Sequence, residues 1–160
     1  VYWLAIIRGW YDRFSAISVN LAKLPQDAKG YAILEVISEE DIQPLKHPAG
    51  IELKWVINPH PGENSSLLLD QIQLISWLKG SLSVWVACEF SSMKTLRAFF
   101  KNDIAIEKQN FYISSYWKLG NNEDQHKEMK RIDLAEMTWK KLHLKNKNQL
   151  SELVLSFIRL

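Results

Sequence analysis

The chain has 160 residues, of which 47% are hydrophobic and 24% charged, values typical of one folded globular domain with a core. They exclude a disordered or fibrous chain, and the length excludes a complete two-domain enzyme. Twenty Lys and Arg against 18 Asp and Glu give a net charge of +2, which excludes a strongly basic nucleic-acid-binding protein.

Cysteine and histidine usage narrows the chemistry further. The single cysteine, Cys88, excludes an internal disulfide and a Cys-rich zinc site, and it favours a reducing compartment, so we expect a cytoplasmic protein. The histidines have no metal-ligand spacing, so no metal is predicted. The chain begins at Val1 without a methionine or a signal-peptide pattern, and we expect its natural start to lie upstream. No apolar run approaches the roughly 18 residues that a membrane span needs.

The first half of the chain alternates buried strands with one helix. A continuous apolar run over 2–8 predicts a parallel strand that is covered on both faces. Helical spacing predicts a helix over 14–24, which Pro25 ends. Further buried strands are predicted over 31–37 and 51–57, with a loop over 39–50 between them.

The second half continues the alternation. Ser65 or Ser66 is predicted to cap a helix that runs to Leu78. A strand over 82–87, a helix over about 92–102 and a strand over 111–115 follow. This order predicts an α/β domain with an open, mainly parallel five-stranded sheet and helices on both faces.

The last 40 residues have a different character. Residues 121–131 are mostly charged, and a basic stretch over 140–147 is predicted to interrupt one or two amphipathic helices. The apolar positions that suggest these helices are 134, 137, 142, 144, 150, 153, 154 and 157. The basic stretch is either a solvated face and linker or an arm that binds a partner. We predict an α/β domain over 1–131 and a helical C-terminal extension over 132–160.

Ligands of such sheets bind outside the carboxyl ends of the strands, so the first strand-to-helix turn is a candidate site. This turn, 9–13, contains one glycine, Gly9, and lacks the three-glycine dinucleotide fingerprint. The helix that follows attracts anions at its N-terminus. Asp12 would repel a phosphate there, whereas Arg8 and Arg13 can offset its charge.

A second candidate site follows the fourth strand, at Ala87, Cys88 and Glu89. Small residues at a strand end let a planar ring approach the backbone. Glu89 either caps the next helix or binds a ligand amide, and its position leaves both open. Cys88 is either a nucleophile activated by the helix or a buried inert thiol. No partner His and no Ser/His/Asp set is assignable, so no catalytic residue is predicted.

Several segments together resemble the C-terminal half of the siderophore-interacting protein family, flavin-containing ferric-siderophore reductases related to ferredoxin–NADP reductases. The resemblance covers about residues 3–131, and its segments are AISVNLAKLP at 16–25, EV at 35–36, QPL at 43–45, VWVACE at 84–89 and SYWKLG at 115–120. It implies a ferredoxin reductase-like NAD(P)H-binding domain that packs against an N-terminal barrel holding FAD. Electrons from NAD(P)H or ferredoxin then reduce Fe(III) in a siderophore to Fe(II).

The resemblance also implies site residues. The family's cofactor turn falls on 9–17, where this chain keeps the glycine and the final Ala-Ile, and Gly9, Asp12 and Arg13 are the cofactor-binding candidates. Ala87, Cys88 and Glu89 fall at the nicotinamide end of the pocket. Tyr116 and Trp117 are also cofactor-binding candidates, and Trp117 either lies near the flavin or is a structural plug.

Basic residues in the C-terminal part are the candidates for substrate binding. The family uses basic residues near the flavin to hold acidic siderophores, and here these are Lys118, His126, Lys127 and Lys130. A solvated helix is the alternative. Residues 138–160 have no family counterpart. A second hypothesis is a truncated, non-catalytic binding module whose C-terminal helices pair two copies, and on either hypothesis we expect the isolated domain to be inactive.

Overall fold

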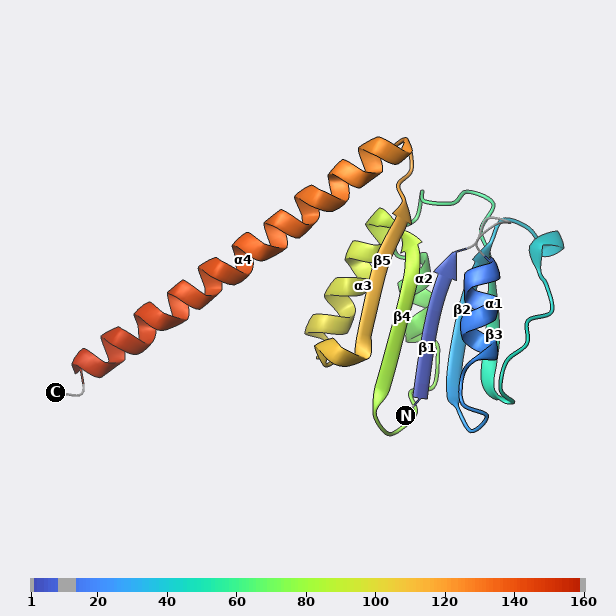
Figure 1. Cartoon of the computed structure of the whole chain (residues 1–160), viewed down its shortest axis with the longest axis horizontal. Helices are drawn as coiled ribbons and strands as arrows, with labels where there is room; N and C mark the ends of the chain where they lie inside the picture. The colour runs from blue at the N-terminus through green and yellow to red at the C-terminus, as the bar shows by residue number, and fades with distance from the viewer. Residues whose placement is uncertain (1, 9–13, 159–160) are drawn as a thin grey trace. The chain divides into compact units, whose positions relative to one another are not determined.

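The computed structural model describes the backbone of residues 2–8 and 14–158, and the side chains of Leu4 and of residues 17–145. Five parallel strands form a sheet with the order β3-β2-β1-β4-β5 (Figure 1). Their bounds are β1 Tyr2–Arg8, β2 Lys29–Val36, β3 Gly50–Ile57, β4 Leu82–Glu89 and β5 Phe111–Trp117. The predicted α/β class with parallel strands is confirmed. Between β1 and β4 the strand order reverses, and ligands of such folds bind at this point of the carboxyl edge.

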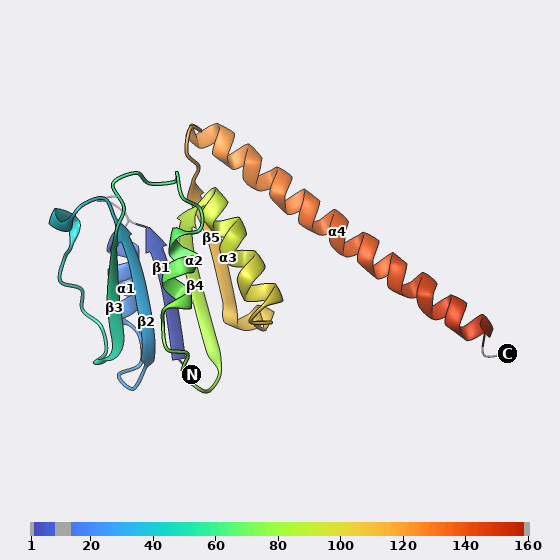
Figure 2. The same cartoon turned by 180° about the vertical axis from the view of Figure 1, so that it is seen from behind.

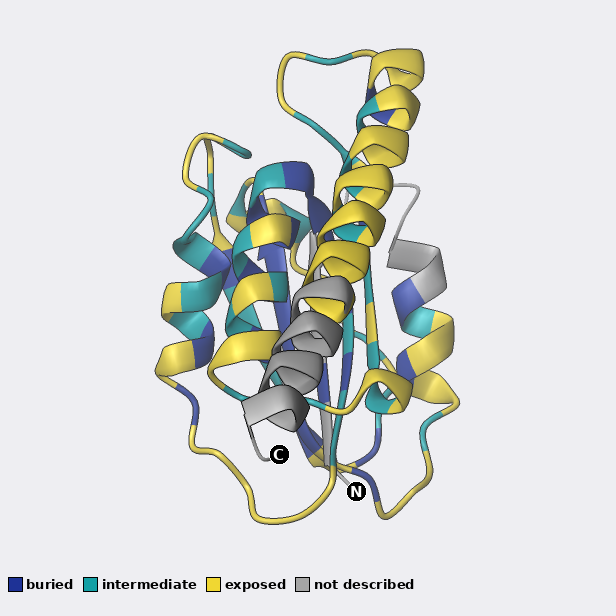
Figure 3. Ribbon diagram, turned by 90° about the vertical axis from the view of Figure 1, so that its left-hand side faces the viewer, coloured by how far each residue is buried: buried dark blue, intermediate teal, exposed yellow. Residues whose placement is uncertain are grey.

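Helices cover both faces of the sheet. One face carries α1, and the other carries α2 and α3, which lie in front of the strands when the molecule is seen from behind (Figures 1 and 2). The helices are α1 Phe14–Ala22, α2 Leu67–Gln73, α3 Phe90–Asn102 and α4 Glu123–Ile158, with short 3₁₀ turns at Glu39–Asp41 and Lys108–Asn110. The buried parts of the strands lie between the two helical layers (Figure 3).

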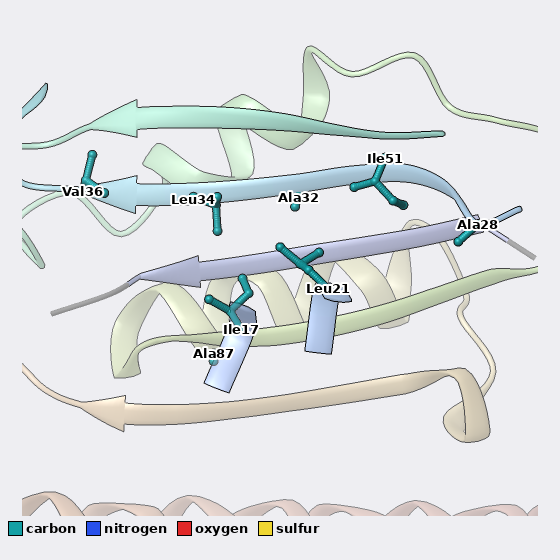
Figure 4. Close-up of a cluster of buried hydrophobic side chains, with 8 residues drawn as sticks. All are labelled: Ile17, Leu21, Ala28, Ala32, Leu34, Val36, Ile51 and Ala87. Atoms are coloured by element: carbon teal, nitrogen blue, oxygen red, sulfur yellow. The ribbon is translucent and has the colours of Figure 1, made fainter. Parts of the chain in front are cut away.

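The core beneath α1 explains why this helix docks on the sheet. Ile17 and Leu21, one helical turn apart, are 1% and 2% exposed and pack on Ala32 and Leu34 of β2 (Figure 4). Burying a side chain of this size contributes about 1.5–3 kcal/mol. Residues at the centre of the sheet, such as Ala32, are small, and this lets α1 approach the sheet closely.

Several element ends differ from their predicted positions. Both β4 and β5 continue two residues beyond the predicted ends, and α3 begins at Phe90 directly after Glu89. The predicted end of α2 at Leu78 is wrong, because the helix ends at Gln73. There the N–H of Leu74 bonds to the carbonyl of Gln71, the tighter spacing that commonly closes a helix.

The chain divides into two units, Val1–Gly120 and Asn121–Leu160. The second unit is one helix, α4, so the predicted interruption at the basic stretch 140–147 is wrong. That stretch contains no Gly or Pro, and Lys and Leu are good helix formers. The predicted boundary at 131 falls inside α4, whereas the unit boundary lies before it. The apolar positions 150–157 lie outside the described side chains, and no described helix is long and apolar enough to cross a membrane.

Candidate functional site

The candidate site is the carboxyl edge of the sheet, where all five strands end. The loop between β3 and α2 crosses this edge above the strand ends (Figures 1 and 2). The predicted cofactor turn with Gly9, Asp12 and Arg13 follows β1 in the sequence. These three residues lie outside the described part of the chain, so their roles stay predictions.

Glu89 joins three elements at one end of the edge. Its side chain is the N-cap of α3: Oε2 accepts hydrogen bonds from the backbone N–H groups of Ser91 and Ser92. Oε1 accepts a third from the N–H of Leu119, beyond β5, at 3.4 Å. The residue is 2% exposed. Of the two roles left open by the sequence, the structure places Glu89 in helix capping, and it adds the link to the segment after β5.

A β-bulge shapes the same end of the edge. Cys88 pairs with Ser115 and Glu89 pairs with Trp117, so Tyr116 is the extra residue in β5. Tyr116 is 42% exposed. The bulge therefore brings the backbone of Trp117 opposite the strand position that carries the helix cap.

Trp117 is covered by the crossing loop at Gly62. A Cβ on Gly62 would lie 2.8 Å from Cη2 of the Trp117 ring, and the φ of Gly62 is +86°. Both the space and the backbone conformation therefore require glycine. This contact places Trp117 in a plug between the loop and the end of β5, one of its two predicted roles.

Ala87 and Cys88 point to opposite faces of β4. Ala87 belongs to the core cluster beneath α1, beside Ile17 (Figure 4). Strand alternation places Cys88 on the side of α2 and α3, where it is 1% exposed. The burial of its thiol favours the inert alternative over the nucleophile.

The other end of the edge is held by a buried carboxylate and an amide. Glu35, the penultimate residue of β2, is 5% exposed, and its Oε1 accepts a hydrogen bond of 2.6 Å from Nδ2 of Asn58. Asn58 follows β3, and its Oδ1 accepts from the N–H of His60 at 3.2 Å. The backbone N–H of Asn58 bonds to the carbonyl of Val36 at 2.7 Å. We call Glu35 and Asn58 the β2–β3 clasp.

Two lysines flank Phe90 at the start of α3. Lys118 Nζ lies 5.4 Å and Lys94 Nζ 5.6 Å from the centre of the Phe90 ring, within the range of a cation–π contact. Phe90 is 4% exposed. Lys118, a predicted substrate-binding residue, thus shares the Phe90 ring with a second lysine that the sequence did not reveal.

The other predicted substrate-binding residues lie on α4. His126 is 6% exposed, whereas Lys127 and Lys130 are exposed. Lys127 Nζ lies 3.0 Å from Glu123 and 3.8 Å from Asp124. The hydrogen bond to Glu123, together with the charges of both carboxylates, raises the pKa of Lys127. These residues belong to the second unit and Lys118 to the first, so their predicted gathering around one ligand stays a prediction.

The residues of the edge can be compared with the needs of a dinucleotide. Glu89 already accepts from the first N–H groups of α3, so this helix N-terminus does not offer them to a phosphate. The clasp at β2 and β3 supplies the carboxylate that binds ribose hydroxyls in related folds, so this part of the edge fits the cofactor. Within the described residues no group of three or more His, Cys, Asp or Glu could hold a metal ion.

A cavity of about 380 Å³ lies elsewhere, beneath α1. Most of its lining is apolar, and it lies beside the end of α1 and the start of β3, away from the carboxyl edge. The residues that line it are Leu4, Ile17, Asn20, Leu21, Lys23, Leu24, Pro25, Tyr31, Ile51 and Trp85. Because this cavity lacks the convergent polar groups of a dinucleotide site, the carboxyl edge of the sheet remains the candidate site.

Sequence reasoning missed three residues of the edge: Glu35, Asn58 and Lys94. A signal existed for the first, because an acidic residue at the end of the second strand is part of the dinucleotide fingerprint. The glycine pattern at 9–13 that should accompany this acidic residue is incomplete, so the sequence does not single out Glu35. No sequence signal places Lys94 and Lys118 at the same ring, since this arrangement depends on the packing of α3 against β5.

Comparisons with known proteins agree with the sequence resemblance. Residues 14–120 match the profile of a family described as siderophore-interacting protein. The chain is 33% identical over 133 residues to the ferric vibriobactin reductase ViuB of Vibrio cholerae, covering 82% of this chain and 49% of that protein. The chain spans about half the length of the curated relatives it matches.

Solved structures show the same fold. The siderophore-interacting protein SipS from Aeromonas hydrophila superposes with a TM-score of 0.68 at 22% identity, over 81% of this chain and 52% of that one. A siderophore utilization protein from T. fusca gives a TM-score of 0.68 at 26% identity, over 78% of this chain and 48% of that one.

Proposed function

Because the chain belongs to the siderophore-interacting protein family, we propose that it is the NAD(P)H-binding part of a flavin-dependent ferric-siderophore reductase. The observation that carries this proposal is the family match over 14–120, which spans the strand ends of β2 to β5. The 33% identity to a ferric vibriobactin reductase supports the reaction class. The single cysteine supports a reducing, cytoplasmic site of action.

The chain's own residues bind and orient the dinucleotide in this proposal. The turn with Gly9, Asp12 and Arg13, at the N-terminus of α1, holds the pyrophosphate. The nicotinamide lies at the carboxyl end of β4, beyond the buried Ala87 and Cys88. The plug of Trp117 and Gly62 lies beside Tyr116 at the end of β5, and these residues would border the bound cofactors. Glu89 positions this end by fixing α3 and the segment after β5.

The redox chemistry belongs to the cofactors. One NAD(P)H supplies two electrons as a hydride, which through FAD reduce two Fe(III) ions to Fe(II) and leave NAD(P)⁺ and one proton. FAD is held mainly by a partner domain of the same protein, and ferredoxin is an alternative electron donor. The isolated chain does not turn over on this proposal.

The chelate is collected by charge. Lys94 and Lys118 lie near the ring of Phe90 at the start of α3. Their charges attract ferric siderophores that carry negative charge. His126, Lys127 and Lys130 of α4 are the other residues proposed to bind the chelate. Lys127 contributes less than a solvated lysine would, because Glu123 and Asp124 compensate its charge.

The test uses the protein expressed from its natural coding sequence, with any residues that precede Val1. We expect it to bind FAD and to release two Fe(II), trapped by a ferrous chelator, for each NAD(P)H oxidised with a ferric siderophore. The gallium complex of the same siderophore has the same shape and charge but is not reduced, so it should support no oxidation above background. A folded, flavin-loaded protein that oxidises no NAD(P)H with the ferric complex would contradict the proposal.

A second candidate function is a non-catalytic module in which α4 pairs two copies. The observation that favours it is the exposure of large apolar side chains on this helix: Leu134 is 64%, Trp139 59% and Leu142 56% exposed. Sedimentation equilibrium of the chain measures this directly. A monomer throughout the micromolar range, combined with saturable NAD(P)H binding, would remove this candidate.

A further inference from the structure

One face of α4 has the shape that receives another helix. A hollow of about 520 Å³ lies along it, and among the described residues its lining belongs to α4 alone. We call it the α4 hollow, and its residues are Arg131, Leu134, Ala135, Thr138, Trp139 and Leu142. Four residues at i, i+3, i+4 and i+7 form a hole for one side chain of a facing helix, and this set contains two such holes. The small residues Ala135 and Thr138 belong to both.

The unit that carries this face has no second described element to cover it. The unit Asn121–Leu160 consists of α4 and the few residues around it. Leu134 is 64%, Trp139 59% and Leu142 56% exposed. Most helices in proteins gain their stability by burying such a face. A partner from outside the unit is therefore expected, and the charges of the helix indicate which one.

The charge of α4 changes sign at the middle of the α4 hollow. Residues 123–136 contain five Asp and Glu against three Lys and Arg, whereas residues 137–150 contain four Lys and no Asp or Glu. The α4 hollow spans 131–142, so its midpoint also lies between 136 and 137. Two copies that run in the same direction would bring like charges together. In opposite directions, the acidic half of each copy faces the basic half of the other.

We propose that α4 pairs with α4 of a second copy in the opposite direction about this midpoint, so that each hollow receives side chains of the other copy. Such an interface is self-complementary, as a twofold dimer requires. Ala135 then lies level with Thr138 of the second copy. Glu128 and Lys145 continue the spacing by three residues at either end, and they lie level with each other across the pair. The inference gives the pairing in the second candidate function a direction and a register, and it holds whether or not the protein is a reductase.

Both charges of this outer pair are accessible in the single chain. The side chain of Glu128 is 57% exposed, and its Oε2 accepts a hydrogen bond of 3.0 Å from Arg131. A carboxylate has about four acceptor positions, so Glu128 can bind Arg131 and a lysine of the second copy together. Lys145 is exposed. The twofold symmetry provides this pair twice.

Sedimentation equilibrium of the full chain at low salt tests the pairing. We expect a monomer–dimer equilibrium in the micromolar range. Leu142→Asp places a charge in the α4 hollow and should weaken association about 30-fold or more. Leu144→Asp is the matched control, because Leu144 is 62% exposed and does not line the hollow. Circular dichroism verifies that both variants keep the helix.

Cysteine cross-linking measures the direction of the pair. Glu128→Cys and Lys145→Cys chains are mixed in equal amounts and oxidised. Opposite directions predict mainly the mixed disulfide between positions 128 and 145, whereas the same direction predicts disulfides between like chains. Cys88 is 1% exposed, so the unaltered chain should not cross-link. Without any disulfide, Glu128→Lys should weaken association about three- to tenfold, and adding Lys145→Glu should restore it.

The outcomes are independent of the proposed function, whose dinucleotide site lies in the unit Val1–Gly120. A chain that stays monomeric to about 100 μM would overturn the inference. A monomer that instead binds phosphatidylserine vesicles through the same face would also overturn it and assign the face to a lipid surface. Equal weakening by Leu142→Asp and Leu144→Asp would exclude the α4 hollow as the interface. Disulfides between like chains would overturn the opposite direction.

Discussion

Two buried glutamates hold the two ends of the carboxyl edge in different ways. Glu89 is 2% exposed and accepts hydrogen bonds from three backbone N–H groups, which belong to α3 and to the segment after β5. Glu35 is 5% exposed and accepts from the side-chain amide of Asn58. Backbone donors move only if the fold moves, whereas a side-chain amide can rotate. The comparison predicts that the fold depends more on the bonds to Glu89 than on the bond between Asn58 and Glu35.

The largest expected effect is the loss of the cap at Glu89. Glu89→Ala leaves three N–H groups without their acceptor at a buried helix start, and we expect it to lower the free energy of unfolding by about 3 kcal/mol. Urea unfolding followed by tryptophan fluorescence measures this change. Glu107→Ala is the control, because Glu107 precedes a 3₁₀ turn without capping it through its side chain. Similar losses in both variants would show that the cap does not hold this end.

A corresponding variant at the other end of the carboxyl edge tests the role of Asn58. Asn58→Ala removes one side-chain donor, and we expect it to cost about 1 kcal/mol in the same unfolding measurement. A cost as large as that of Glu89→Ala would place both glutamates among the groups on which the fold depends. The comparison between the two ends would then fail.

A variant at Gly62 should lower the free energy of unfolding by an intermediate amount. Gly62→Ala places a methyl group against Trp117 and holds alanine at a positive φ, and we expect a loss of about 2 kcal/mol. Gly120→Ala is the matched control, because Gly120 has a φ of +77° and open space around it. The difference between the two variants in thermal unfolding isolates the contact with Trp117. Equal losses would show that backbone conformation alone requires glycine at position 62.

The sequence was sufficient for the order of elements but not for the roles of the two glutamates. Apolar runs and helical spacing predicted all five strands and the first three helices, because these patterns reflect burial in the core. A carboxylate directly before a helix, as at Glu89, suits both a cap and a ligand. Only the hydrogen bonds to Ser91, Ser92 and Leu119 distinguish these roles.

Other features depend on contacts between distant segments. The bulge at Tyr116 arises from the pairing of β5 with β4, and the need for glycine at position 62 arises from Trp117, far along the chain. Neither leaves a local pattern in the sequence. The continuity of α4 was predictable from the sequence, since the basic stretch over 140–147 has no helix breaker and a run of positive charge does not by itself end a helix.

The smallest expected effect concerns charge at the β5 end of the edge. If Lys94 and Lys118 attract an anionic chelate, the double variant Lys94→Gln/Lys118→Gln should bind a ferric catecholate complex about three- to tenfold more weakly at low salt. Fluorescence quenching measures this affinity, and Lys108→Gln, at the turn before β5, is the control.

Raising the salt to about 1 M shortens the range of the interaction to about 3 Å and should remove the difference. A difference that persists at high salt would mean that the lysines act through direct contacts, and no difference at low salt would remove them from the binding surface.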